Sequence, residues 1–156
     1  MRRKDREILD KNEIYKIMQE CTCCRVGFYD EGETYIVPLN FGYTLVEDKL
    51  CLYFHSAKEG RKVSLAEKGV NVGFEMDTAY KVRGEDIACE YTASFKSIIG
   101  NGVISVVKDK KEKNLGMQRV MYQTTGRDNW SFNPIMMSQV CIMKIEVTNL
   151  SCKVHE

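Results

Sequence analysis

The segment FHSAKEGRK, from Phe54 to Lys62, holds the side chains in this sequence that are best suited to chemistry. It follows an alternating run that predicts a strand, and it leads into a segment that predicts a short helix. Backbone N–H groups at the start of that helix, the guanidinium of Arg61 and the ammonium of Lys62 would meet at one place. This arrangement is typical of a phosphate-binding site, although a solvated basic loop before a helix has the same composition.

Three neighbouring residues extend the predicted phosphate site. Gly60 allows the backbone to come close to an anion, and Ser56 offers a hydroxyl group. His55 is a candidate catalytic residue because an imidazole can donate or accept a proton, although a histidine at a strand end is often simply hydrogen-bonded. We therefore expect a local anion site with His55 beside it.

A second pattern, YIVPLNFGY, covers residues 35–43. Pro38 lies within a strand-like run, and a proline lacks the N–H group that a central strand needs, so we expect a sheet edge or an interruption here. Backbone groups near Pro38, together with the side chain of Asn40, can then contact a flat heteroaromatic ligand. The two patterns together favour a ligand with an aromatic ring and a phosphate group.

Cys21 and Cys24 have the C-x-x-C spacing found in zinc and redox sites. The sequence has two histidines and no second such pair, so a tetrahedral metal site would need distant ligands. The pair also follows the carboxyl end of a predicted helix, whereas a helix amino terminus is what lowers a thiol pKa. We expect no metal site, and we interpret the cysteines in apolar-patterned segments as buried thiols of a reducing compartment: Cys51, Cys89 and Cys141.

The composition is that of a soluble protein with one domain over residues 1–156. This length supports one core without disulfides or a structural metal. The 23 basic and 22 acidic residues nearly balance, which argues against nucleic acid or an anionic membrane as a partner. No apolar run approaches the length of a membrane span. We expect a cytoplasmic protein whose partner is a small molecule.

Short strands are the elements that would position these residues. Capping-box patterns at Asp10 and Asp109 predict helices over 11–20 and from 110 to near 125, and Gly69 ends a short helix at 64–68. Many short strands with few helices favour a mainly β fold, an antiparallel barrel with appended helices. The predicted strands cover residues 24–28, 34–39, 49–55, 70–76, 89–99, 103–107, 137–147 and 150–154.

Four segments, PLNFGY, LYFHSAKEGRK, VNVGFEMD and CEYTASFKSIIGNGVI, resemble the successive motifs of the split-barrel flavoproteins related to pyridoxamine-phosphate oxidase. The likeness covers most of the chain. It is greatest for the nitroimidazole-resistance (Nim-type) branch, which typically reads PLNFGY and FHxAxxGRK at these places. The resemblance implies a six-stranded antiparallel split β-barrel and a homodimer that binds FMN in clefts at the subunit interface.

The resemblance also implies which residues contact the cofactor. Ser97 stands where related oxidases place a polar side chain on a long strand, so it is a further candidate. The other implied contacts are Pro38, Leu39 and Asn40 along the isoalloxazine, His55 and Ser56 by the flavin and its tail, and Gly60, Arg61 and Lys62 at the phosphate.

The implied function is that of an FMN-dependent oxidoreductase, which passes electrons from NADH, NADPH or another donor to a small acceptor such as a nitroimidazole. The flavin supplies the redox chemistry and the chain positions it. No GxGxxG motif is present, so a nicotinamide would bind over the flavin itself. Vitamin B6 oxidation is not expected, because the arginine-and-proline tail that grips pyridoxal is missing. The alternative is a flavin- or haem-binding sensory module with little turnover.

Overall fold

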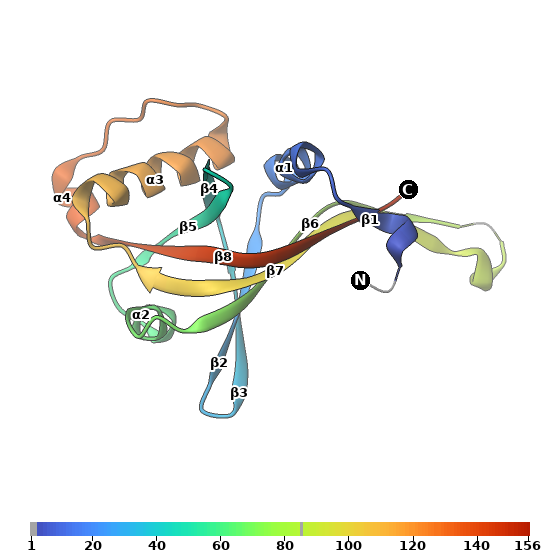
Figure 1. Cartoon of the computed structure of the whole chain (residues 1–156), viewed down its shortest axis with the longest axis horizontal. Helices are drawn as coiled ribbons and strands as arrows, with labels where there is room; N and C mark the ends of the chain where they lie inside the picture. Colours follow the sequence, from blue (N-terminus) through green and yellow to red (C-terminus); the bar gives the residue numbers. More distant parts are fainter. Residues whose placement is uncertain (1–2, 85) are drawn as a thin grey trace.

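The fold is a large antiparallel sheet with helices attached, as the computed structural model of residues 3–84 and 86–156 describes it (Figure 1). The helices are α1 (Lys11–Glu20), α2 (Arg61–Glu67), α3 (Lys110–Thr125) and α4 (Pro134–Ser138), with 3-10 turns η1 (Lys4–Arg6) and η2 (Ala88–Glu90). The strands are β1 (Glu7–Ile8), β2 (Cys24–Asp30), β3 (Glu33–Leu39), β4 (Phe41–Val46), β5 (Lys49–Ala57), β6 (Asn71–Arg83), β7 (Thr92–Val106) and β8 (Val140–His155). In this part of the chain, no helix has the length and apolar character needed to cross a membrane.

The predicted mainly β split barrel is confirmed, but the expected number of six strands is wrong. The sheet has eight strands in the order β3-β2-β6-β7-β8-β5-β4, with β1 beside β8. Strand β4 was not predicted, and the two-residue β1 leaves no pattern in the sequence.

Two long strands replace four predicted ones. β7 continues through Gly100 and Gly102, opposite a bulge at residue 148 of β8, so the paired strands bend without a break in the sheet. A Cβ at either glycine would lie 2.4 Å from a neighbouring atom, so only glycine fits against Phe74 and the backbone of β8. β8 likewise runs unbroken past Asn149, since it pairs with β7 on both sides of that bulge.

The two edge strands of the sheet are consecutive in sequence. Among the residues described, β3 pairs only with β2, and β4 pairs only with β5 at the opposite end of the sheet. Asn40 alone separates these two strands. The sheet therefore curls into a barrel whose two edge strands meet at residues 39–41. Away from this point, the described residues of β3 and β4 do not pair with each other. We call this junction the seam.

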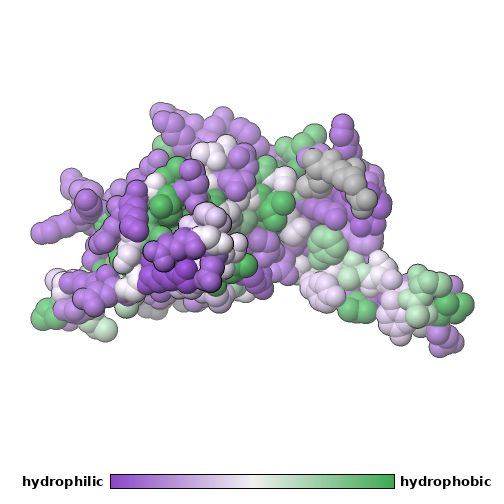
Figure 2. Space-filling model, turned by 90° about the horizontal axis from the view of Figure 1, so that it is seen from below, coloured by the Kyte–Doolittle hydropathy of each residue, from purple (hydrophilic) through white to green (hydrophobic). Residues whose placement is uncertain are grey.

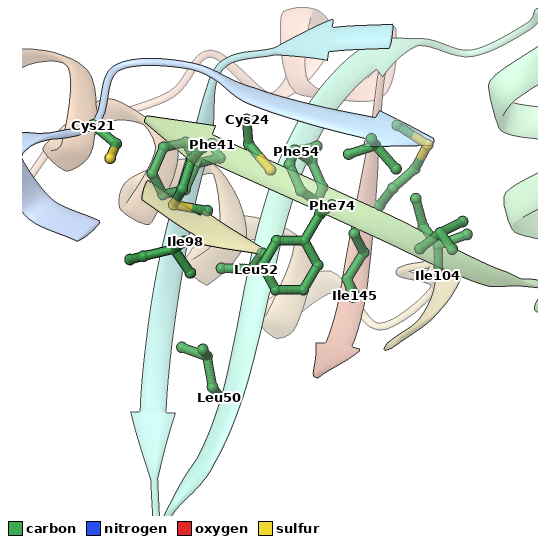
Figure 3. Close-up of a cluster of buried hydrophobic side chains, with 14 of the residues drawn as sticks. Cys21, Cys24, Phe41, Leu50, Leu52, Phe54, Phe74, Ile98, Ile104 and Ile145 are labelled. Carbon is green, nitrogen blue, oxygen red and sulfur yellow. The ribbon is translucent and has the colours of Figure 1, made fainter. Parts of the chain in front are cut away.

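The core fills the inside of the curled sheet (Figure 3), and α1 contributes Ile14, Ile17 and Met18 to it. Helix α1 begins at Asp10, whose carboxylate accepts hydrogen bonds from the N–H groups of Asn12 and Glu13, so the predicted cap is confirmed. The buried side chains drawn and labelled in the figure are Cys21, Cys24, Phe41, Leu50, Leu52, Phe54, Phe74, Ile98, Ile104 and Ile145.

Helix α3 lies across the outer face of β4 and β5, where two glycines make room for it. A Cβ on Gly42 would lie 2.1 Å from the backbone carbonyl carbon of Arg119, and one on Gly116 would lie 2.8 Å from the ring of Tyr53. The helix and strand backbones thus meet directly at Gly42, whereas at Gly116 the helix backbone rests on the Tyr53 side chain. Gly42 belongs to the PLNFGY motif. A glycine is needed at this position because α3 packs directly against it, and not because of an unusual backbone conformation.

β6 and β7 extend beyond the body of the molecule as an arm, formed by residues 78–84 and 86–94 (Figures 1 and 2). In the described part of the arm these strands pair with each other and with no third strand. Cys89 lies in η2 on this arm and is exposed, so its predicted burial within a strand is wrong. The apolar pattern around it belongs to a projecting hairpin, whose large exposed side chains are Tyr80, Val82, Ile87 and Tyr91.

Candidate functional site

The predicted phosphate-binding residues lie where β5 ends and α2 begins. Gly60 precedes the helix with φ 129°, a backbone conformation that side-chain-bearing residues rarely adopt. No described atom lies within 4 Å of the position that a Cβ would take there. The helix starts at Arg61, three residues before the predicted start, so Arg61 and Lys62 form its first turn. Because α2 has only seven residues, the two cationic side chains are the main source of positive charge.

Arg61 is held by the hairpin of β2 and β3. Its Nε donates a hydrogen bond to Oδ2 of Asp30 at 2.8 Å, and its guanidinium carbon lies 4.7 Å from the centre of the Tyr35 ring. The hydrogen bond to Asp30 raises the pKa of Arg61. Only Nε is engaged with a described residue, and 43% of the side chain is exposed, so the two terminal nitrogens remain free to bind an anion.

Ser56 is 8% exposed, and its Oγ has no hydrogen-bond partner among the described residues. It lies on β5 on the same face as the core residues Leu52 and Phe54, so its hydroxyl points into the barrel. A buried hydroxyl without a partner costs about 1–3 kcal/mol. A hydrogen bond to a ligand or to water would offset that cost, so Ser56 fits a ligand-binding role.

The predicted ring-binding residues line the seam. Pro38 lies on the edge strand β3 and is exposed, which confirms the expectation from its missing N–H group. Leu39 packs against the core, so only its backbone is available to a ligand. Asn40 is exposed at the point where the chain crosses from β3 to β4.

His55 lies next to Asn40 at the seam, on the strand β5 that pairs with β4. The first rung of the β4–β5 ladder joins Phe41 to Phe54, so Asn40 and His55 flank this rung on opposite strands. Both side chains are exposed, whereas both phenylalanines are buried in the core. The fold therefore brings together Pro38, Asn40 and His55 on the outside of the seam.

The structure does not bring Ser97 to the other predicted residues within one chain. Ser97 lies on β7 between Asp77 of β6 and Lys153 of β8, close to the base of the arm. His55 pairs with Ile142, at the opposite end of β8. Eleven residues of β8 separate Ile142 from Lys153, which is about 35 Å along a strand.

Sequence reasoning missed Asp30 and Tyr35 as parts of this site. Asp30 lies outside the predicted strands, and Tyr35 was assigned only to a strand and to the YIVPLNFGY pattern. Both contact Arg61, which is 31 residues from Asp30 in the sequence. A contact between separate elements leaves no periodic signal, so no pattern in the sequence indicated it.

Cys21 and Cys24 are buried in the core (Figure 3), and Cys24 lies opposite Leu39 in the β2–β3 ladder. The thiol of Cys21 donates to the carbonyl oxygen of Ile17 at 3.3 Å, and burial raises the pKa of Cys21 to about 12. Burial also raises the pKa of Cys24. Such thiols are poor nucleophiles. The described residues contain no group of three or more metal-ligating side chains.

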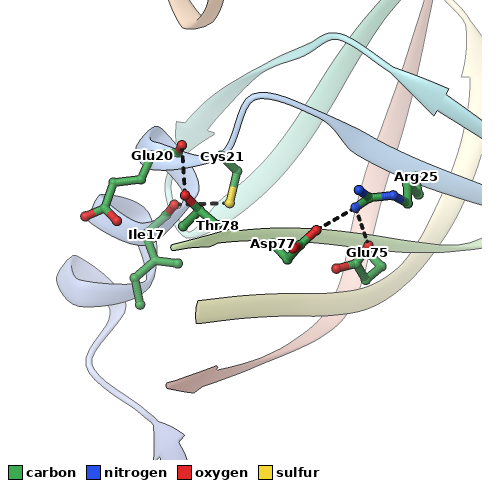
Figure 4. Close-up of polar contacts among 7 residues, drawn as sticks. All are labelled: Ile17, Glu20, Cys21, Arg25, Glu75, Asp77 and Thr78. Atoms are coloured by element: carbon green, nitrogen blue, oxygen red, sulfur yellow. Dashed lines mark hydrogen bonds and ion pairs between the residues drawn. The ribbon is translucent and has the colours of Figure 1, made fainter. Parts of the chain in front are cut away.

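Arg25 forms an ion-pair cluster on the outer face of the sheet. Its Nη1 lies 2.9 Å from Glu75 and 2.6 Å from Asp77 (Figure 4). The cluster ties β2 to β6, but its members are partly exposed, so it contributes little to stability. It is a surface feature of the sheet and not part of the cationic corner at Arg61.

An antiparallel split barrel with a cationic corner and an exposed seam defines the class of protein. Residues 10–154 match the sequence profile described as pyridoxamine 5'-phosphate oxidase. The chain belongs to this family, and the resemblance seen in its motifs is confirmed.

Solved structures agree with this assignment. A candidate 5-nitroimidazole antibiotic resistance protein from Bacteroides thetaiotaomicron is 30% identical, with a TM-score of 0.79 over 95% of this chain and 86% of that chain. A flavocytochrome from Azotobacter vinelandii is 15% identical, with a TM-score of 0.78 over 100% of this chain and 72% of that one. An FAD- and haem-binding protein from Mycobacterium smegmatis is 13% identical, with a TM-score of 0.77 over 97% and 74%. The last two show a common fold alone. A comparison with curated proteins found no match.

Proposed function

We propose that this chain is an FMN-dependent oxidoreductase that reduces a small acceptor, such as a nitroimidazole, with electrons from NADH, NADPH or another donor. The observation that carries the proposal is the cationic corner. Among the described residues, the terminal nitrogens of Arg61 have no hydrogen-bond partner, and neither has the buried hydroxyl of Ser56, five residues earlier. The likeness to a candidate 5-nitroimidazole resistance protein supports the choice of acceptor.

The spacing along β3 fits a flavin mononucleotide. Tyr35 lies under Arg61, where the phosphate would bind, and Pro38 lies at the seam, where the ring would bind. Three residues of strand cover about 10 Å. The five-carbon ribityl chain of FMN joins its ring to its phosphate over a comparable length. Tyr35 and Pro38 face opposite sides of β3, so the cofactor would pass across the free edge of this edge strand.

The residues of the chain bind and orient, and FMN when bound supplies the electron-transfer chemistry. Arg61 and Lys62 would neutralise the phosphate, and Ser56 would donate a hydrogen bond toward the tail of the cofactor. The side chain of Asn40 would fix an edge of the ring. We assign His55 to the acceptor, because its exposed ring N–H can donate to a polar atom of a molecule bound at the seam.

The seam explains why a second copy belongs to this proposal. Pro38, Asn40 and His55 are exposed, so a ring lying against them would face water on its other side. A flat ligand bound in this way is better shielded between two chains, which supports a homodimer with FMN at the interface. The seven cysteines are free thiols, which supports a cytoplasmic location.

An absorbance spectrum of the freshly purified protein, followed by release and identification of any chromophore, tests the cofactor. FMN titration then tests the phosphate site. Replacing Arg61 and Lys62 together with alanine removes two charge-assisted contacts of about 1.5–3 kcal/mol each, so the affinity for FMN should fall at least about ten-fold. Lys68→Ala, at the other end of α2, is the matched control. Equal titration curves for all three proteins would reject the phosphate assignment.

Activity is tested with NADH or NADPH and a nitroimidazole. Oxidation of the donor that depends on the acceptor supports the oxidoreductase. The second candidate function is a flavin- or haem-binding module with little turnover, and the haem-containing neighbours are the observation that favours it. Bound flavin or haem together with no oxidation of the donor across several acceptors would support that module instead.

A further inference from the structure

The hairpin of β2 and β3 ends next to the start of α2. Asp30 and Glu33 form its last rung, and the turn between them contains Glu31 and Gly32, both with positive φ. Asp30 is therefore fixed by strand pairing on one side and by a tight turn on the other. Contacts between α2 and β2 place the first turn of the helix beside it.

Two contacts from this hairpin determine the orientation of the Arg61 guanidinium. Asp30 accepts from Nε at 2.8 Å, which fixes one edge of the planar group, and the Tyr35 ring lies under its face. A guanidinium held by Nε and by one face keeps the edge with its two terminal nitrogens pointing away from the carboxylate. That edge is the one that can form two parallel hydrogen bonds to a phosphate.

The same carboxylate can act in the opposite sense, because a negative charge near a phosphate repels it. The position of Asp30 decides between these effects. Its side chain is 21% exposed, lies behind Arg61 and is bonded to Nε, so the positive charge stands between it and a phosphate on the outer edge. The gain from orienting the Arg61 guanidinium should therefore outweigh the repulsion between Asp30 and the phosphate.

This inference rests on the proposed function. We propose that Asp30 and Tyr35 are positioning residues that fix Arg61 for two-point binding of the FMN phosphate. Their effect is confined to the phosphate, so they determine how strongly the protein prefers FMN over riboflavin, which has the same ring and ribityl chain without the phosphate.

The test measures the dissociation constants of FMN and riboflavin by flavin fluorescence, with the full chain in every case. The ratio of the two constants reports the phosphate alone. We expect Asp30→Ala to lower the preference for FMN about five- to ten-fold and to leave riboflavin binding unchanged. Asp30→Asn should retain more of the preference, because its amide oxygen still accepts from Nε. Glu33→Gln, a change of charge on the same hairpin, should have a much smaller effect, because Glu33 influences Arg61 through its charge and not through a hydrogen bond.

A second measurement separates positioning from a general structural role. In an Arg61→Ala background, Asp30→Ala should cause no further loss of the preference, because Asp30 favours phosphate binding only through Arg61 and otherwise repels the phosphate. Tyr35→Leu should also lower the preference. Tyr35 packs against Phe28 as well, so urea unfolding must accompany this variant, and the Asp30 variants decide the question.

Three results would overturn the inference: an increased preference for FMN in Asp30→Ala, an equal loss of affinity for both ligands, or the same loss with and without Arg61. A wild-type protein that binds FMN and riboflavin equally would instead reject the phosphate site and the proposed function with it. A wild-type protein that strongly prefers FMN, with no change in Asp30→Ala, would reject only the role of Asp30.

Discussion

The outer face of the sheet is covered by α3 over β4 and β5 and is bare over β2, β6 and β7. Glycines occur in both regions, but the space around their Cα atoms differs. A Cβ on Gly42 would lie 2.1 Å from the backbone of α3, whereas one on Gly27 would lie 3.8 Å from its nearest neighbour and one on Gly73 would lie 3.6 Å from Asn101. The chain's own packing requires the glycine under α3. It does not require the two on the bare face.

The bare face forms a hollow of about 520 Å³. Ile36 and Ile99 stand at its sides, and Gly27 and Gly73 form part of its floor. A glycine inside a strand weakens the strand and often marks a place where a ligand or another backbone approaches. Arg25 lines the hollow and pairs with Pro38, so the hollow lies close to the seam, where the proposed homodimer would hold its cofactor.

Gly42→Ala should have the largest effect on stability. The added methyl group meets backbone atoms of α3, which cannot move aside without moving the whole helix. We expect a loss of about 3 kcal/mol or more in the free energy of unfolding, measured by urea titration at one protein concentration. Gly27→Ala is the matched control and should change stability by no more than about 1 kcal/mol, because its methyl group has room. Similar losses in the two variants would remove the distinction between the faces.

Gly116→Ala should have a smaller effect, although it also lies under α3. Here the methyl group meets the side chains of Tyr53 and Ile142, at 2.8 and 2.9 Å, and side chains can shift. Alanine also favours a helix over glycine by about 1 kcal/mol, which offsets part of the strain. We expect a net loss of about 1 kcal/mol in the same titration. A loss as large as that of Gly42→Ala would mean that the helix cannot adjust.

Ile99→Asp tests what the bare face does. Ile99 is 52% exposed, so we expect its replacement to change the stability of a single chain by less than about 1 kcal/mol. If a second copy covers this face, the charged side chain should lower the molar mass in light scattering to that of one chain. Ile135→Asp on α4 is the control, since Ile135 is exposed to 74% outside this face. The same molar mass in both variants would exclude this face from the dimer.

Thiol reactivity should separate the core from the arm. Cys89 is exposed on the arm, whereas burial raises the pKa of Cys21 to about 12 and also raises the pKa of Cys24. At pH 8 a thiol reagent should modify Cys89 rapidly and the two core cysteines only on unfolding. Peptide mapping after a short pulse of reagent checks this order. Rapid modification of Cys24 in the folded protein would contradict the burial of the C-x-x-C pair.

The same thiols give a small dependence of stability on pH. The pKa of Cys21 is higher in the folded chain than in the unfolded chain, where a thiol titrates near about 8.5. The unfolded thiol therefore loses its proton first, so its contribution is fully present below about pH 8.5 and declines as the pH rises toward 12. Unfolding free energies at about pH 8 and 10 should show a decline that is smaller in Cys21→Ala.

Features set by neighbours in the sequence were predicted well. The capping box at Asp10 and the helical spacing after it predicted α1 at its observed bounds, Lys11–Glu20. The missing N–H of Pro38 placed β3 at an edge. Both signals act within a few residues, which is the range that a sequence pattern can report.

Features set by contacts between distant elements were not predicted. β4 was missed because its outer face carries Gly42 in place of an alternating polar residue. This glycine is required by the packing of α3, which the local sequence does not indicate. The two halves of β7 were separated at Gly100 and Gly102, whose packing against β8 keeps the strand continuous. The Asp30–Arg61 contact joins a hairpin to a helix, so neither segment alone indicates it.

The position of β8 in the sheet has a consequence for how the protein is made. This strand joins β7 on one side to β5 on the other, and it is synthesised after both of them. Until β8 leaves the ribosome, the nascent chain can form a four-stranded piece and a separate two-stranded hairpin, each with an open edge and unprotected apolar side chains. We expect chaperones to engage the nascent protein at this stage, and β8 to release it by joining the two pieces.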